Sequence, residues 1–298
     1  MTNQEADQQI LVGIDPNDPS VPMLTWAADE ADRRGLPLRL LLAVPPVHDT
    51  QQRESTPQHV SRQEQGREAL AAARDTVLRH TPRAQVSTEL LDGQPAVALC
   101  RRTVGPTRMI VVGSRGLSRA AEILSARSVA VPLSAQAHCP VVVVKSPEHT
   151  ARHPARLVVG VDGSASSREA AKFAFEEAAA RHASVHAVWV WPRPLIEFGG
   201  GEAGLEERTR RLGEVVAECS TGHPGVSLTQ EVRRGHPVEE LARAASDALA
   251  LVVGRRGFGG YTGMRLGSVV HGLLHRAECP VITVPGEPSE GEGMNGGG

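Results

Sequence analysis

The sequence predicts an α/β protein built from two copies of one domain, each a five-stranded parallel sheet with helices on both faces. Landmark segments of the first half recur in the second half in the same order. Within each half, short β-branched runs alternate with longer helical patterns, which is typical of strand–helix–strand units. A length of 298 residues also suits two domains of ordinary size.

The internal repeat rests on four pairs of segments. These are ILVGID at 10–15 with LVVGVD at 157–162, GQP at 93–95 with GHP at 235–237, IVVGSRG at 110–116 with LVVGRRG at 251–257, and CPVVVV at 139–144 with CPVITV at 279–284. The offset between partners drifts slowly along the chain, as expected of a duplication with small loop insertions. We therefore expect one domain at 8–147 and a second at 155–286. A polar connection joins them, and a disordered polar tail follows at 287–298.

Apolar runs mark the strands, because parallel strands covered on both faces are continuously apolar. The strands are expected near 9–14, 38–44, 85–91, 108–112 and 141–144, and near 156–161, 185–190, 226–232, 249–253 and 281–284. The last strand of each half would otherwise be an exposed apolar edge, so these two strands are expected to pair antiparallel. The first helix of each half carries an apolar stripe at helical spacing. The stripes are Met23, Trp26, Ala27 and Ala31, and Ala170, Phe173, Ala174 and Ala178.

Composition excludes several classes of function. A net charge of -2 and few aromatic residues provide neither the basic surface nor the stacking platform of a nucleic-acid-binding protein. No apolar run is long enough to span a bilayer, and the polar, acidic first residues do not resemble a secretory signal. We therefore expect a cytoplasmic protein with neither nucleic acid nor membrane as a partner.

A glycine motif in the second half predicts a phosphate site. Gly254 and Gly257 follow the fourth strand, and Gly267 and Ser268 precede an apolar helix pattern. Glycines let backbone N–H groups approach phosphate oxygens, and a helix start adds unpaired donors and a positive dipole end. Asp162 ends the first strand, where its carboxylate would suit a ribose hydroxyl or an adenine amino group. Arg255 and Arg256 could reach a triphosphate, or they could lie in an exposed loop without ligand contact.

These motifs together resemble the universal stress protein family in its tandem two-domain form. The matching segments are VGVDGS at 159–164, the Gly-x-Pro turns, Gly-x2-Gly-x9-Gly-Ser at 254–268, and CPV before each last strand. The resemblance implies Rossmann-like domains of the adenine nucleotide α-hydrolase type that bind adenine nucleotide and dimerise through the last strand. It also implies a regulatory protein rather than an efficient enzyme.

The expected nucleotide site consists of Gly160, Asp162, Ala187, Val253, Gly254, Gly257, Gly267, Ser268 and Val269. A second site in the first half would consist of Gly13, Asp15, Ala43, Gly113, Gly116, Arg127 and Ser128. Arg127 stands where the second half has Gly267, and Asp18 adds a negative charge beside the expected phosphates. Arg127 either fills a dead site or grips a phosphate directly. We favour a dead or altered first site, because a guanidinium stem obstructs the access that glycine provides.

The leading hypothesis is a cytoplasmic stress or dormancy regulator for which ATP, with or without Mg, is a sensed or structural ligand. The alternatives are an adenylating enzyme or weak ATPase, and a nucleotide-free interaction scaffold. No catalytic constellation stands out, so we expect weak ATP hydrolysis at most. His271 and His275 have a spacing that can hold zinc, but no further ligand completes the set, and no metal site is expected. The expected partners are adenine nucleotide, a second copy of the chain and an unidentified regulated protein.

Overall fold

The computed structural model describes residues 8–46, 57–114, 129–145, 154–191, 201–258 and 265–286, and it confirms the α/β fold. The first half contains strands β1 (Gln9–Gly13), β2 (Leu38–Val44), β3 (Val86–Asp92), β4 (Thr107–Gly113) and β5 (Val141–Val144), and helices α1 (Val21–Arg34), α2 (Pro57–His80), α3 (Pro95–Arg102) and α5 (Ala130–Gln136).

The second half repeats this order. Its strands are β6 (Arg156–Gly160), β7 (Ser184–Trp191), β8 (Leu228–Arg234), β9 (Ala250–Gly254) and β10 (Val281–Val284), and its helices are α6 (Ala165–Arg181), α7 (Gly201–Gly222), α8 (Pro237–Ala244) and α9 (Ser268–Arg276). Each strand begins and ends within two residues of its expected position.

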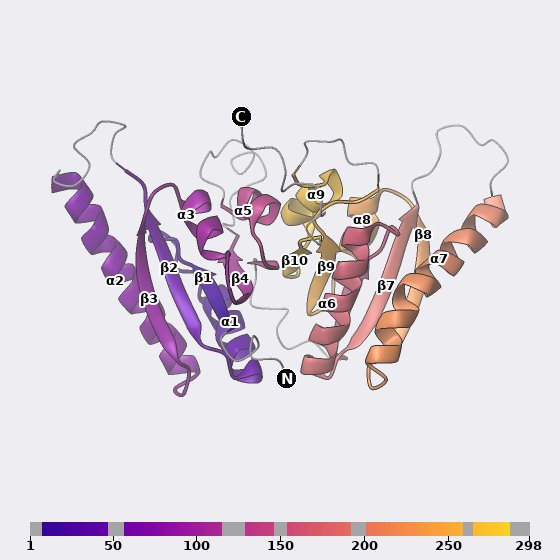
Figure 1. Cartoon of the computed structure of the whole chain (residues 1–298), viewed down its shortest axis with the longest axis horizontal. Coiled ribbons are helices and arrows are strands. Elements are labelled where there is room, and N and C mark those ends of the chain that lie inside the picture. The colour runs from indigo at the N-terminus through magenta and orange to yellow at the C-terminus, as the bar shows by residue number, and fades with distance from the viewer. Residues whose placement is uncertain are drawn as a thin grey trace, which may run out of the picture.

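A single ten-stranded sheet joins the two halves. The strand order is β3-β2-β1-β4-β5-β10-β9-β6-β7-β8, and neighbouring strands within each half are parallel. At the centre β5 pairs antiparallel with β10, and Val142 lies opposite Ile282. This confirms the expected pairing of the two last strands. Figure 1 shows the halves side by side, with α2 and α7 at the outer flanks.

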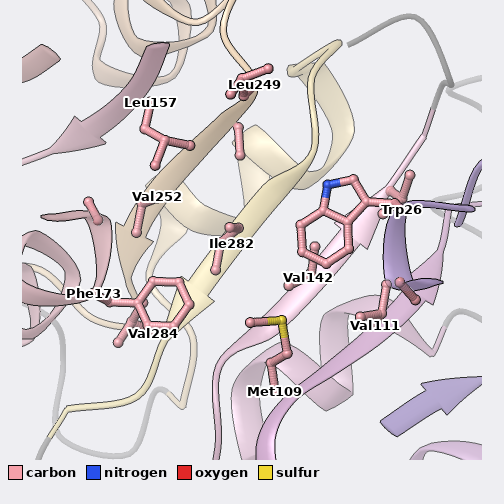
Figure 2. Close-up of a cluster of buried hydrophobic side chains, with 14 of the residues drawn as sticks. Trp26, Met109, Val111, Val142, Leu157, Phe173, Leu249, Val252, Ile282 and Val284 are labelled. Atoms are coloured by element: carbon pink, nitrogen blue, oxygen red, sulfur yellow. The ribbon is translucent and has the colours of Figure 1, made fainter. Parts of the chain in front are cut away.

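Helices cover both faces of the sheet and bury two cores. One core contains apolar side chains of α1, α2, α6 and α7, and the other contains side chains of α3, α5, α8 and α9. Both stripes expected from the sequence are buried, including Trp26 and Phe173. The first core continues from one half into the other across β5 and β10, where Val142 and Ile282 lie between Trp26 and Phe173 (Figure 2).

The helix ends follow from local chemistry. The Ser164 side chain accepts a hydrogen bond of 3.1 Å from the backbone N–H of Ser167 and so caps the start of α6. Ser20 caps α1 in the same way through the N–H of Met23. Helix α1 ends at Gly35, whose φ of 63° lies in the left-handed region that glycine adopts readily.

Helices α1 and α6 meet in a buried cluster of charges. Glu30 accepts hydrogen bonds from Arg34 of its own helix and from Arg181 of α6, the latter at 2.5 Å. Glu177 of α6 accepts hydrogen bonds from Arg34 and, at 3.3 Å, from Arg181 of its own helix. Both carboxylates are fully buried, so each depends on these arginines for compensation. We call these four residues the inter-half ion cluster.

Among the described residues, no helix is both long and apolar enough to cross a membrane. The expected tail at 287–298 and most of the expected connection between the halves lie outside the described residues.

Candidate functional site

The candidate site lies at the carboxyl edge of the sheet, at the point where the strand order reverses. Successive strands lead outward from β6 to β7 and β8, whereas β9 lies on the opposite side of β6. Gly160 at the end of β6 pairs with Val253 near the end of β9. The loops that follow these two strands are therefore adjacent, and such a crevice is where open parallel sheets bind ligands.

Asp162 joins the two loops. Its Oδ1 accepts a hydrogen bond from the N–H of Ser164 at 3.0 Å, within the loop that leads to α6. Its Oδ2 accepts a hydrogen bond from the N–H of Phe258 at 2.8 Å, beyond the glycine segment 254–257. Because a carboxylate has about four lone-pair positions, Asp162 can hold both loops and still accept a hydrogen bond from a ligand.

Two of the three motif glycines lie in close contacts, Gly254 with backbone atoms and Gly257 with the end of a side chain. A Cβ atom on Gly254 would lie 2.5 Å from the carbonyl oxygen of Ser166, which belongs to the first turn of α6. A Cβ atom on Gly257 would lie 2.5 Å from Oδ2 of Asp162. These glycines therefore let the segment approach α6 and Asp162 closely, whether or not a ligand is present.

Gly267 differs from both, because its surroundings would admit a side chain. Among the described residues, a Cβ atom there would meet no atom closer than 3.5 Å, and the φ of -68° suits any residue. Its N–H donates to the carbonyl oxygen of Arg255 at 3.0 Å, which places the start of α9 against the glycine segment. Contacts with the described residues therefore do not require a glycine here, and the open position would leave room for a ligand.

Helix α9 provides backbone donors beside this space. It begins at Ser268, whose side chain is exposed, and Gly267 at the cap has no side chain to accept from the first turn. The first N–H groups of any helix have no acceptor within the helix. They carry the positive end of the helix dipole, so this position favours an anion such as phosphate.

The structure places the two loop arginines differently. The N–H of Arg256 donates to Oγ of Ser166 at 3.3 Å, and its side chain is exposed. Arg255 is partly buried and directs its guanidinium away from the glycine segment, toward the carbonyl oxygen of Ala137 in the first half. Burial, and then the positive charge of Arg256, lowers the pKa of Arg255.

Three apolar residues of the expected site occupy different environments. Val253 is buried in β9, and Val269 is partly buried against the second core. Ala187 does not reach the carboxyl edge: it is fully buried within β7 and pairs with Val159. The expectation for Ala187 is therefore corrected. Strand register places Val190, not Ala187, at the position that matches Ala43 of the first half.

The first half contains a cavity of about 1180 Å³ at the equivalent edge. Gly13, Asp15, Ala43 and Gly113 line it, as expected for a second site. Asp15 also accepts hydrogen bonds from Asn17, at 3.0 Å from the backbone N–H and 3.3 Å from the side chain. Gly116, Arg127 and Ser128 lie outside the described residues, so the expected asymmetry between the halves stays a prediction.

Sequence reasoning missed the residues that hold the loops together. Ser166 contacts Gly254 and accepts from Arg256, and Phe258 donates to Asp162. A serine in a first helical turn and a residue after a glycine carry no distinctive signal, because their roles arise from tertiary contact. Within the ranges described above, no three histidine, cysteine or acidic side chains gather as metal ligands would.

Comparison with known proteins places these features in context. The sequence model of the universal stress protein family matches residues 8–145 and 155–285. Universal stress protein Rv2623 of Mycobacterium tuberculosis is 33% identical over 295 residues, spanning 95% of this chain and 98% of that protein. A universal stress protein of Mycolicibacterium smegmatis is also 33% identical, over 298 residues, 95% of this chain and 99% of that protein. A crystal structure of a universal stress protein from Archaeoglobus fulgidus shares the fold, with a TM-score of 0.70, 20% identity and coverage of 93% and 96%.

Proposed function

The chain belongs to the universal stress protein family, and on this premise we propose that its second half binds ATP at the carboxyl edge between β6 and β9. The observation that carries the proposal is the space at Gly267 beside the first turn of α9. A glycine that packing does not require, next to unpaired N–H donors, is the arrangement that a phosphate group needs.

Each group at the edge has a proposed role. The glycine segment 254–257 and the first turn of α9, with Ser268, hold the phosphates, and the exposed Arg256 adds positive charge. Asp162 keeps the two loops together and uses its remaining lone pairs for the nucleoside end. A carboxylate repels phosphate but accepts hydrogen bonds from ribose hydroxyls and an adenine amino group. Any Mg would enter with the phosphates.

We propose a regulatory rather than a catalytic role for the bound nucleotide. In this proposal the protein is a cytoplasmic stress or dormancy regulator, and two copies of the tandem chain pair with each other. A turnover assay separates this role from an adenylating enzyme or ATPase. Sustained ATP consumption well above background would support the enzyme and contradict the proposal.

The nucleotide itself can be identified directly. Mass spectrometry of the small molecules released from freshly purified, denatured protein is expected to detect an adenine nucleotide. Its absence, together with no calorimetric response to added ATP, would instead favour a nucleotide-free scaffold.

The location of the site can be tested by filling the space at Gly267. We expect Gly267→Arg to weaken ATP binding at least tenfold by calorimetry, because the new side chain occupies the space and the protein still folds. Gly225→Arg is the matched control: no atom of the described residues lies within 4 Å of a Cβ added to Gly225, which lies between α7 and β8. Equal affinity in both variants would remove the second half as the principal site.

A further inference from the structure

Arg255 holds the glycine segment in place through its backbone. Its N–H donates to the carbonyl oxygen of Val284 in β10 at 2.9 Å, and its own carbonyl accepts the N–H of Gly267 at 3.0 Å. The residue therefore connects the segment after β9 both to the last strand and to the start of α9. Any displacement of Arg255 would change the spacing between the glycine segment 254–257 and the first turn of α9, which are the two proposed sources of N–H donors to phosphate.

The side chain of the same residue leaves the site and crosses to the first half. Its Nη2 donates to the carbonyl oxygen of Ala137, the C-cap residue of α5. The last carbonyls of a helix have no partner within the helix, and they carry its negative dipole end, so a guanidinium is a favourable partner there. Figure 1 shows α5 next to α9 at the centre of the molecule, and the two helices are in contact.

The first half does not repeat this arginine. The matching residue in the first half is Ser114, whose N–H pairs with Val144 just as that of Arg255 pairs with Val284. The backbone roles are therefore equivalent, but a serine side chain is too short to cross the interface as Arg255 does. The second half reaches into the first through a residue that the repeat does not duplicate.

Helix α5 links this contact to the cavity of the first half. Val129, Ala130 and Pro132, at its beginning, line the cavity. Leu133 in its middle is fully buried, and Ala137 at its end accepts the hydrogen bond from Arg255. Because close-packed interiors transmit strain, a displacement of Ala137 would pass along this short helix to the cavity wall.

We propose that Arg255 is a positioning residue that fastens the glycine segment of the second half to α5 of the first. Nucleotide binding at that segment then stabilises α5 and the wall of the first-half cavity. The inference rests on the proposed function, because it requires ATP to bind at Gly254, Gly257 and Gly267. It adds that the nucleotide site of the second half keeps its binding geometry only when the first half is docked against it.

Hydrogen exchange of the full chain, with and without saturating ATP, tests this inference. In the wild type, ATP is expected to slow exchange at 254–258 and 265–271, and also at 130–138 in the first half. In Arg255→Ala, saturating ATP should still slow the first two segments but leave 130–138 unchanged, and the ATP affinity should fall roughly tenfold. Arg255→Lys keeps a cation and a long stem, and it should restore part of the effect at 130–138.

Two further variants separate the explanations. Arg256→Ala removes a positive charge from the same segment without touching α5, so at saturating ATP it should keep the slowing at 130–138. At an ATP concentration that fills the wild-type site but leaves Gly267→Arg unoccupied by calorimetry, that variant should show no slowing at 254–258, 265–271 or 130–138. The inference is overturned if 130–138 still slows in Arg255→Ala or in Gly267→Arg, since ATP would then act on α5 by another route. It is also overturned if wild-type protein slows only at the glycine segment, a result that leaves the proposed function intact. Absence of any ATP binding would instead reject the proposed function.

Discussion

At the scale of single residues, Gly254 and Gly267 look alike in the sequence but serve different needs. Gly254 lies against the backbone of Ser166, where an added Cβ would be 2.5 Å from the carbonyl oxygen. At Gly267, by contrast, no atom of the described residues would crowd an added Cβ. The sequence motif alone could not separate a glycine required by packing from one that a ligand would require.

Stability measurements should distinguish the two glycines. We expect Gly254→Ala to lower the free energy of unfolding by about 1–3 kcal/mol, because backbone atoms cannot easily move aside. Gly267→Ala should change it by less than about 0.5 kcal/mol. Urea unfolding followed by circular dichroism measures both. A destabilised Gly267→Ala variant would show that packing, not ligand access, explains this glycine.

Asp162 is the second residue whose role can be measured. Asp162→Ala should weaken ATP binding and reduce the preference for ATP over GTP, because the contact to the nucleoside end is lost. It should also loosen the glycine segment, since the N–H of Phe258 loses its acceptor. Calorimetry with ATP, GTP and adenosine makes the comparison, and Asp15→Ala in the first half is the matched control. Equal losses for ATP and GTP, with adenosine binding unchanged, would contradict the nucleoside contact.

At the scale of helices and strands, the sequence predicted most of the fold. The strands were predictable because β-branched runs buried on both faces, such as Val141–Val144, have few other environments. The helix stripes were predictable because Trp26 and Phe173 each belong to a set of apolar residues that recur at helical spacing. The direction of Arg255 and the partners of Asp162 were not predictable, because they depend on which loops tertiary packing brings together. Ala187 was misplaced because position within a strand requires the register, which the motif does not contain.

The inter-half ion cluster tests how α1 and α6 hold together. Glu30→Ala should lower the free energy of unfolding by about 3–5 kcal/mol, because Arg34 and Arg181 lose a buried counter-charge. Glu214→Ala is the control: it removes one partner of Arg210 on the exposed surface of α7 and should cost less than about 1 kcal/mol. Equal effects in urea unfolding would mean that the cluster is as weak as a surface ion pair.

At the scale of the whole molecule, the joined sheet and shared core predict that the halves stay together without their connecting peptide. A protease site inserted between Lys145 and Pro154 allows this peptide to be cut in the folded protein. The two fragments should elute from a sizing column together, at the volume of the uncut chain. Separate elution would show that the peptide, rather than the β5–β10 pairing, holds the halves.

A substitution in the central strands provides the contrast. Ile282 is 1% exposed and lies opposite Val142, so Ile282→Asp places a carboxylate without compensation in the shared core. After cutting, we expect the fragments of this variant to separate while those of the wild type remain associated. Co-elution of the cut variant would place the strength of the interface elsewhere, for example in the ion cluster.

The antiparallel β5–β10 seam has one more consequence. If two separate copies of a single half met along such a seam, every mutation would appear on both sides at once. In the fused chain a mutation changes only one side, because the two equivalent positions are encoded separately. Ser114 and Arg255 show this independence, because the two equivalent positions carry different side chains and the guanidinium of Arg255 reaches Ala137 in the other half. Joining the halves therefore allows equivalent positions of a symmetric architecture to take different roles, as we propose for Arg255.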